Sequence, residues 1–424
     1  MKILVIGKGG REHALAYACK RSALCDELIC APGNPGMAKI GECVDVKDND
    51  VDGLVALAKE RNVDLTIVGP EATLALGVVD AFKKEGLKIF GPDKKATQVE
   101  SSKDFAKKIM AKYNIPTAAY KTFYDLESAW TYVQEQGAPI VIKEDGLKAG
   151  KGVTVASTLE QAKEALDIAF AIENNSVVIE ECLFGFEFSL ICLVHNETVV
   201  PLEVAQDHKC VFDGDKGPNT GGMGTVSPNP FLPEGMDEVL KKVKKITSEI
   251  IDEAMHEIMK PMASAMVKEG VSFTGFLYGG LMLTEKGIKT IEFNARFGDP
   301  EAEVILPRLE SDFVQAILDL MDNKPVELKW TDKVSHGVVL ASTNYPASST
   351  KGSLITGVDD VDGLVFHMGT KMTDEGLVTD GGRVLMVVTL EDDLQTAFDH
   401  TYKELEKIQC KDLFHRNDIG KKDM

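Results

Sequence analysis

The sequence lacks several features that define common protein classes. No apolar run reaches the roughly 18 residues that a membrane-spanning helix needs, and the chain enters a strand-like stretch at residues 3–6 directly. The eight cysteines form no CxxC pair, which disfavours a zinc site and a disulfide framework. A GxSxG elbow is absent too, so catalysis by a covalent nucleophile is poorly supported. We expect a cytoplasmic protein without a targeting or membrane segment.

Basic residues are in the minority, because 47 Lys and Arg stand against 67 Asp and Glu, a formal net charge of −20. This balance disfavours nucleic acid and anionic membranes as partners, so any anionic ligand has to be bound locally. A chain of 424 residues indicates roughly two to four domains. We expect a monomer that acts on small molecules.

Three regions differ in their pattern of apolar residues. Residues 1–102 alternate short apolar strands with helices, which predicts an α/β domain with an open parallel sheet and a ligand at the carboxyl ends of its strands. Residues 103–326 contain longer strands and one amphipathic helix at about 236–268, which indicates an α+β region. Residues 327–424 combine short strands with a final helix and predict a small β-rich domain.

The first glycine-rich turn, GKGGREHAL, follows the strand at 3–6 and opens a helix. Its glycines let a phosphate approach backbone N–H groups at the helix N-terminus. A dinucleotide-binding fingerprint is less favoured, because no glycine stands at the sixth position. A tight turn without a ligand remains an alternative. We favour a phosphate site.

A second motif, VIKEDGLKAGKGV, sets Lys143 at the end of an apolar strand and a loop rich in Gly and Lys after it. Lysine is a common point charge at phosphate sites, and the loop could fold over a polyphosphate. The loop is no Walker motif, because GK[ST] before a helix is missing. A solvated lysine hairpin is the alternative.

The segment IEFNARFGDPE sets Glu292 and Asn294 on one face of a strand, because side chains alternate with a period of two. Their oxygens suit Mg²⁺, which binds one or two protein ligands together with substrate phosphates. Arg296 continues that face and could bind a phosphoryl or carboxylate oxygen. The alternative is an edge strand with polar residues toward solvent.

The long stretch DHKCVFDGDKGPNTGGMGTVSP, residues 207–228, mixes Asp, Lys, Asn, Thr and Gly. Carboxylates can bind an amine and Gly-rich backbone can bind a phosphate, so the stretch favours substrate binding. A disordered segment is the alternative.

These motifs resemble, in order, those of the glycinamide ribonucleotide synthetases within the ATP-grasp superfamily. The resemblance rests on GKGGREHAL, VGPEATL, SKDFAKKIM, PIVIKEDGLKAGKGV, VVIEECLFGFEFS, AQDHK, DGDKGPNTGGMG and IEFNARFGDPE, and it spans essentially the whole chain. It implies a Rossmann-like N-terminal domain, an ATP-grasp module and a small C-terminal β domain. In the module a small lobe at about 118–190 and a large lobe at about 191–326 enclose ATP.

The resemblance also implies a reaction in which glycine and ATP give glycyl phosphate, which the amine of phosphoribosylamine then attacks. ATP is the co-substrate and Mg²⁺ or Mn²⁺ the metal. The implied ATP-binding residues are Lys103, Lys143, Gly150, Lys151, Gly152, Glu180, Glu181, Leu183 and Glu187. The implied substrate-binding residues are Gly9, Gly10, Glu71, Asp213, Lys216, Asn219, Thr220, Gly221, Gly222 and Arg296. The implied catalytic residues are Lys143, Asp213 and Arg296, and Glu292 and Asn294 are the implied metal ligands.

Three motifs depart from the family's pattern, at Thr73, at Glu144 and Lys148, and at Cys210. Cys210 stands where arginine is usual, and we expect it to weaken a contact in the substrate loop. Two other functions remain open, namely a sister ATP-grasp ligase for another amine and a nucleotide-binding regulator without turnover. Intact Lys143, Glu292 and Asn294 argue against the regulator.

Overall fold

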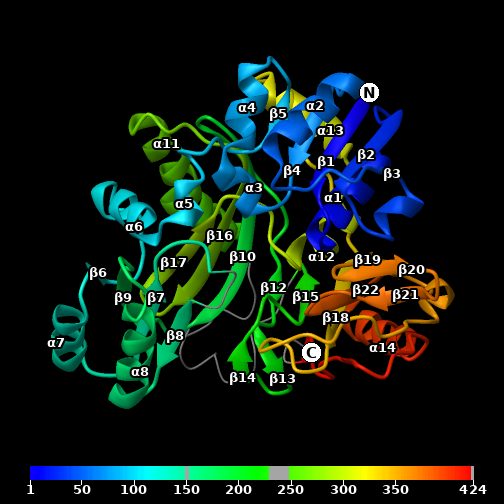
Figure 1. Ribbon diagram of the computed structural model, residues 1–424. Helices are drawn as coiled ribbons and strands as arrows, with labels where there is room; N and C mark the ends of the chain where they lie inside the picture. Colours follow the sequence, from blue (N-terminus) through cyan, green and yellow to red (C-terminus); the bar gives the residue numbers. More distant parts are fainter. Residues whose placement is uncertain (149–151, 229–247, 422–424) are drawn as a thin grey trace.

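The computed structural model describes residues 1–148, 152–228 and 248–421 (Figure 1). Its first part is a five-stranded parallel sheet in the order β3-β2-β1-β4-β5. The strands are β1 (Lys2–Gly7), β2 (Glu27–Pro32), β3 (Glu42–Cys43), β4 (Leu65–Val68) and β5 (Ile89–Phe90). The helices are α1 (Gly10–Lys20), α2 (Val51–Arg61), α3 (Glu71–Leu76) and α4 (Val78–Lys84).

Both faces of this sheet are covered, which explains why β1 is apolar throughout. Ile3 and Val5 pack in the cluster that contains α1 residues, whereas Leu4 and Ile6 pack with residues of α2 and α4. Parallel sheets with helices on both faces give such continuous apolar strands. The predicted N-terminal α/β domain is confirmed.

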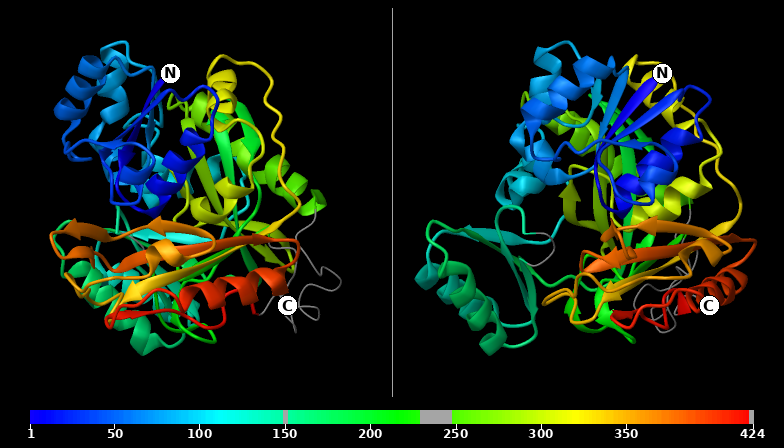
Figure 2. Two further views of the ribbon diagram at one scale, coloured as in Figure 1. Left: turned by 90° about the vertical axis from the view of Figure 1, so that its right-hand side faces the viewer. Right: turned by 45° about the vertical axis from the view of Figure 1, so that its right-hand side comes forward.

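The next part is a four-stranded antiparallel sheet in the order β6-β9-β7-β8. Its strands are β6 (Tyr120–Phe123), β7 (Ile140–Glu144), β8 (Val153–Ala156) and β9 (Val177–Glu181). The helices α5 (Gln98–Ser101) and α6 (Lys103–Lys112) lead to it, and α7 (Leu126–Gln136) and α8 (Leu159–Phe170) pack on it. This lobe projects from the rest of the molecule in the right-hand view of Figure 2.

A second antiparallel sheet, in the order β11-β10-β16-β17, forms the larger lobe. Its strands are β10 (Phe186–His195), β11 (Thr198–Pro201), β16 (Thr274–Thr284) and β17 (Gly287–Asn294). The helix predicted at about 236–268 is helical over residues 248–268, as α10 (Ser248–Ala254), a π-helical turn at Met255–Met259 and α11 (Lys260–Lys268). Residues 236–247 of that prediction lie outside the described residues.

The last sheet joins two distant parts of the chain in the order β12-β15-β18-β22-β19, with β23 beside β18. Its strands are β12 (Gln206–Asp207), β15 (Gly224–Ser227), β18 (Val334–Ser342), β19 (Leu364–His367), β22 (Arg383–Glu391) and β23 (Leu413–Phe414). The helices α12 (Glu301–Ile305) and α13 (Phe313–Met321) precede β18, and α14 (Leu394–Leu405) packs on β18 and β22.

The C-terminal region is thus β-rich as predicted, but its sheet takes β12 and β15 from the middle of the sequence. Two hairpins extend from it, β13 (Cys210–Phe212) with β14 (Lys216–Asn219) and β20 (Thr370–Thr373) with β21 (Gly376–Thr379). Across the three described ranges, no helix combines the length and the apolar composition that crossing a membrane requires.

Candidate active site

A cavity of about 460 Å³ lies where the N-terminal sheet, the two lobes and the C-terminal sheet meet. It brings together residues that are far apart in the sequence, from Arg11 on α1 to Arg383 on β22. Its lining includes Glu71, Lys103, Lys143, Gly152, Glu180, Glu181, Leu183, Glu187, Asn219, Thr220, Gly221, Glu292, Asn294 and Arg296. Most of the residues that the sequence indicates for ATP, metal and substrate therefore share one cavity.

Two lysines share one buried carboxylate on the small lobe. Lys143 Nζ lies 3.0 Å from Glu180 Oε1, and Lys107 Nζ lies 2.9 Å from Glu180 Oε2. Lys143 Nζ also donates to the carbonyl oxygen of Ile291, at 2.9 Å. Burial lowers the pKa of Lys107 to about 8, although Glu180 opposes this shift. The two ammonium groups lie side by side in the cavity lining, where they can bind the oxygens of a polyphosphate.

Lys103 begins α6 and faces the loop after β7. Ser102 caps this helix by accepting a hydrogen bond from the Phe105 backbone N–H, at 3.2 Å. Lys103 Nζ donates to the carbonyl oxygen of Gly146, at 3.0 Å, and its backbone N–H donates to the Asp145 carboxylate. Burial lowers the pKa of Lys103, while the charge of Glu292 opposes the shift. The cap and the loop thus fix this lysine at the cavity.

Glu292 and Asn294 lie on one face of β17, as the alternation predicts, and Asn294 Nδ2 donates to Glu292 Oε1 at 3.3 Å. Burial alone would raise the pKa of Glu292, but Lys209 and Lys143 outweigh it and lower the pKa. The carboxylate is therefore charged at neutral pH, which a divalent cation needs. These two side chains fit a metal ion that also binds phosphates.

Lys209 is a further cation beside this pair. It forms an ion pair with Glu187, the second residue of β10. Burial would lower the pKa of Lys209, but Glu187 and the neighbouring Tyr278 and Glu292 raise it well above its usual value. Lys209, which is half-buried, therefore keeps its charge.

Arg296 follows β17 and connects the large lobe to the N-terminal domain. Its Nη2 lies 3.1 Å from Glu100 Oε1, and its Nε lies 3.5 Å from Glu71 Oε2. Arg11 Nη1 lies 3.5 Å from the same Glu71 oxygen. Burial would raise the pKa of Glu71, but the two arginines lower it to about 2. The network presents two guanidinium groups to one side of the cavity.

The predicted glycines of the first turn lie next to the cavity rather than in its lining. The Gly9 backbone N–H donates to Glu12 Oε2 at 2.7 Å, and α1 begins at Gly10. A Cβ at Gly10 would lie 2.3 Å from Glu303 Oε1, so the backbone at Gly10 and the side chain of Glu303 approach each other closely. Gly222 has a φ of +113°, and a Cβ there would lie 2.5 Å from Asp207 Oδ1.

Two predicted residues of the substrate loop point elsewhere. Asp213 and Lys216 are exposed on the β13–β14 hairpin, and neither belongs to the cavity lining. The Asp213 carboxylate accepts hydrogen bonds from the backbone N–H and Nδ2 of Asn417, at 2.8 and 3.0 Å. This contact with the C-terminal segment directs Asp213 away from the cavity. Gly150 and Lys151 lie outside the described residues.

The three departures from the family's pattern have local partners. Thr73 Oγ1 donates to the Asp48 carbonyl oxygen at 2.8 Å, and Glu144 pairs with Lys148 at 2.8 Å. Cys210 Sγ contacts Asn219 Oδ1 at 3.7 Å, across the β13–β14 hairpin.

Several cavity residues were not identified from the sequence. Arg383 Nη1 donates to the Gly221 carbonyl oxygen at 2.6 Å and lies 2.9 Å from Asp299 Oδ1. Arg383 comes from β22, so only the fold brings it to the Gly221 turn. The others are Arg11, Glu100, Lys107, Asp207, Lys209, Tyr278, Asp299 and Glu301. Asp299 and Glu301 belong to the FGDPE turn, whose density of charge was the available signal.

Three family models match this chain and together cover most of it. They describe the N domain, the ATP-grasp (A) domain and the C domain of phosphoribosylglycinamide synthetase, and they match residues 1–100, 101–302 and 335–422. The ATP-grasp match agrees with a cavity between two antiparallel lobes, and this family uses ATP and a divalent metal.

Named relatives and solved structures agree with these models. A phosphoribosylamine–glycine ligase of Halalkalibacterium halodurans is 49% identical over 100% of this chain and 97% of its own length. A ligase of that name from Lactococcus lactis is also 49% identical, over 99% of both chains. The crystal structure of phosphoribosylamine–glycine ligase from Thermotoga maritima superposes with a TM-score of 0.84 at 31% identity, covering 99% of this chain and 100% of that one. The chain belongs to the phosphoribosylglycinamide synthetase family.

Proposed function

We propose that this enzyme joins glycine to 5-phosphoribosylamine with ATP, giving glycinamide ribonucleotide, ADP and phosphate in purine biosynthesis. The observation that carries the proposal is the single cavity that combines buried lysines, the Glu292 and Asn294 pair and the Arg296 network. Full-length relatives named phosphoribosylamine–glycine ligase support it. A glycine carboxylate oxygen attacks the γ-phosphorus of ATP and ADP leaves. The amine of phosphoribosylamine then attacks the acyl carbon and phosphate leaves.

The proposed ATP site lies between the lobes. Lys103 and Lys143 bind phosphate oxygens, together with the loop that contains Gly150, Lys151 and Gly152. The backbone from Glu180 to Leu183 hydrogen-bonds adenine, and Glu187 accepts from the ribose hydroxyls. The support is that Lys103, Lys143, Gly152, Glu180, Glu181, Leu183 and Glu187 line one cavity. Lysine charge at this place stabilises the charge that builds on the transferring phosphoryl group.

The proposed metal ligands are Glu292 and Asn294, and we propose Mg²⁺, with Mn²⁺ as a substitute. A bound divalent cation would neutralise phosphate charge and polarise the transferring group. The ligand set is oxygen only, which both ions accept. Its charged carboxylate, held ionised by Lys209 and Lys143, supports the assignment.

The proposed substrate site lies on the other side of the cavity. Arg296 binds the carboxylate of glycine or the acyl phosphate, because its planar guanidinium matches such groups. Phosphoribosylamine lies between Glu71, the Gly9–Gly10 turn and the turn from Asn219 to Gly222. The contact between Arg383 and Gly221 supports a fixed turn there. Asp213 and Lys216 have no assigned role in this site, because both side chains lie outside the cavity lining and Asn417 binds the Asp213 carboxylate.

We further propose a cytoplasmic monomer that has only small molecules as partners. All eight cysteines are free, as expected in a reducing compartment. The formal charge of −20 disfavours nucleic acid as a partner.

The test is ADP release by the purified protein with ATP, Mg²⁺ and glycine, with and without phosphoribosylamine formed in place from ribose 5-phosphate and ammonia. Release that requires both substrates supports the ligase. Release with a different amine or carboxylate indicates a sister ATP-grasp ligase. ATP binding without turnover indicates a regulator and overturns the proposal.

A further inference from the structure

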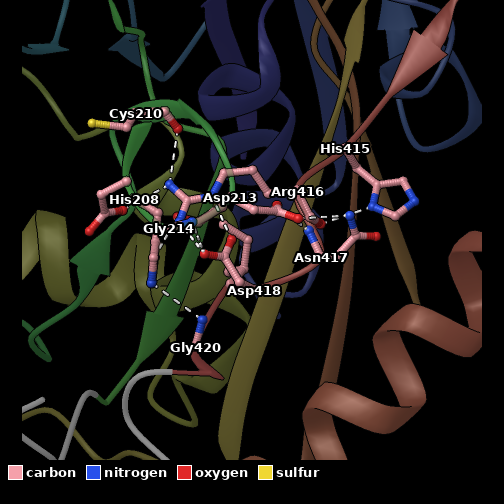
Figure 3. Close-up of polar contacts among 12 residues, drawn as sticks. His208, Cys210, Asp213, Gly214, His415, Arg416, Asn417, Asp418 and Gly420 are labelled. Carbon is pink, nitrogen blue, oxygen red and sulfur yellow. Dashed lines mark hydrogen bonds and ion pairs between the residues drawn. The ribbon is translucent and has the colours of Figure 1, made fainter. Parts of the chain in front are cut away.

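The C-terminal segment after β23 contacts the β13–β14 hairpin through a buried arginine. Arg416 is only 1% exposed, and its guanidinium forms a two-point contact with Asp418. Nε lies 2.7 Å from Oδ1, and Nη2 lies 2.9 Å from Oδ2 (Figure 3). Planar two-point pairs of this kind are strong and fix orientation. This arrangement aims the remaining nitrogen, Nη1, at the hairpin.

Arg416 Nη1 contacts two parts of that hairpin, strand β13 and the turn between β13 and β14. It donates to the Cys210 carbonyl oxygen at 3.0 Å and lies 3.0 Å from Asp215 Oδ1. Asp215 has a left-handed backbone with a φ of +53°, which non-glycine residues rarely adopt. The Gly214 backbone N–H donates to Asp418 Oδ2 at 2.7 Å. Arg416 and Asp418 thus hold the turn of the hairpin from outside the cavity.

The same segment also contacts His208, the residue that precedes Lys209. The Gly420 backbone N–H donates to His208 Nε2 at 3.3 Å (Figure 3). Since Nε2 accepts, Nδ1 carries the proton and faces the Gly224 carbonyl oxygen at 3.3 Å. His208 and Cys210, the two neighbours of Lys209, are therefore both bound by the C-terminal segment.

Lys209 connects this contact to the cavity. Its side chain pairs with Glu187, and its carbonyl oxygen accepts from both the backbone N–H and the Oγ1 of Thr220, each at 2.8 Å. Thr220 Oγ1 in turn accepts from the Gly222 backbone N–H at 2.9 Å. A shift of the Lys209 backbone therefore moves the turn at Asn219–Gly222, which lines the substrate side.

We propose that Arg416, oriented by Asp418, is a positioning residue that sets Lys209 and the Asn219–Gly222 turn for phosphoribosylamine. This inference rests on the proposed function and deepens it by assigning a role to the C-terminal segment. Arg416 does not line the cavity.

The test compares Arg416→Lys and the milder Asp418→Asn with the unchanged protein, and uses Lys411→Ala, an exposed residue just before β23, as control. Lysine keeps the charge but cannot form the two-point contact. We expect the KM for phosphoribosylamine to rise at least fivefold in Arg416→Lys and about twofold in Asp418→Asn. The affinity for ATP measured alone changes at most twofold, because Lys103 and Lys143 come from α6 and β7 and not from the hairpin that Arg416 holds.

Amide hydrogen exchange gives a second readout that needs no activity. We expect residues 206–222 to exchange at least tenfold faster in Arg416→Lys, while β16 and β17 keep their rates. Arg416→Ala adds a rescue arm, in which millimolar guanidinium restores the KM for phosphoribosylamine. An unchanged exchange rate of residues 206–222 in the folded variants overturns the proposal, as does an equal loss for all three substrates.

The two proposals fail in different ways. If the unchanged protein releases no ADP with glycine and phosphoribosylamine, the proposed function fails, and the exchange experiment still decides whether Arg416 holds the hairpin. If the unchanged protein is active and Arg416→Lys has an unchanged KM for phosphoribosylamine, the positioning role fails and the function stands.

Discussion

Lys143 Nζ lies 3.0 Å from Glu180 Oε1, and this carboxylate also binds Lys107 through its other oxygen. All three side chains are at most 5% exposed. One buried negative charge therefore faces two positive charges, which leaves an excess positive charge for an anionic ligand. A buried pair of this kind is costly to break by removing one partner. The arrangement suits a phosphate that adds negative charge without displacing Glu180.

Lys143→Met should lower the rate of ADP formation at least 100-fold, because removing one group that stabilises transition-state charge costs about that much. Lys143→Arg should retain more activity than Lys143→Met, since the charge remains. A coupled ADP assay at saturating glycine measures the effect. Lys163→Ala, on the outer helix α8, is the control. A loss of less than threefold for Lys143→Met would exclude a role in phosphoryl transfer.

Glu292→Gln should raise the Mg²⁺ concentration that gives half-maximal activity by about tenfold, because one charged oxygen ligand is lost. Mn²⁺ should restore part of the rate, because it binds oxygen and nitrogen ligands more tightly than Mg²⁺ does. The measurement is a titration of each ion at fixed ATP. Glu285→Gln, in the exposed turn between β16 and β17, is the matched control. Equal Mg²⁺ curves for the two variants would refute the metal assignment.

Glu71 should stabilise the fold at neutral pH and lose this contribution in acid. Its folded-state pKa is lowered to about 2 from a usual 4.5. A lowered pKa stabilises the fold above the unfolded value and is lost as pH falls from about 4.5 to about 2. The contribution at pH 7 is at most about 3 kcal/mol.

Glu71→Gln tests this directly through urea unfolding followed by circular dichroism. The difference in the free energy of unfolding from the unchanged protein should be largest at pH 7. It should shrink to less than half by about pH 3. A difference that is independent of pH would show that Arg11 and Arg296 do not act on Glu71 through its charge.

Cys43 should be the first cysteine to react with iodoacetamide near neutral pH. Cys30 and Cys43 are paired neighbours on β2 and β3. The hydrogen bond from the Cys30 thiol lowers the pKa of Cys43 to about 7, although burial opposes it. The labelling rate of Cys43 should therefore rise through pH 7, since the thiolate is the reacting form.

Cys30→Ala removes that hydrogen bond and should slow the labelling of Cys43 at pH 7 about fivefold, because fewer thiolates are present but each is more nucleophilic. Peptide mass spectrometry quantifies the modified site. Cys410, which is also half-buried, is the internal control. Cys30 itself should react slowly, because the shared hydrogen bond and burial raise its pKa.

Much of the fold could be predicted because its strands are apolar and locally bounded. β1 and β10 are examples, since each is a run that an alternating or continuous apolar pattern identifies. The sheet of the C-terminal region could not be assembled in this way. β12 and β15 have two and four residues, and β15 joins the sheet through β18, which lies more than a hundred residues later in the sequence.

The candidate site divides in a similar way. Lys143, Glu292 and Asn294 stand at positions where a strand pattern and a motif coincide, and the cavity unites them. Lys107 and Lys108 are neighbours on one predicted helix, and nothing in the local sequence indicates which of them is buried. Lys107 is 3% exposed and Lys108 66% because Glu180, from a distant strand, lies against one and not the other. Asp213 shows the opposite outcome. Its loop predicts a substrate contact, but its carboxylate instead accepts a hydrogen bond from the backbone of Asn417, a residue that is distant in the sequence.

The shared sheet has a consequence for how the chain can be divided. β15 pairs with β12 on one side and β18 on the other, so residues 335–422 do not form a separable module. A fragment that ends near residue 326 would keep β15 as an unpaired edge with the buried side chains of Val226 and Ser227 uncovered. Exposed edges of this kind pair with other chains. Truncated forms should therefore aggregate, and gene fusions or splits should succeed only where they leave β15 and β18 in the same polypeptide or supply both halves together.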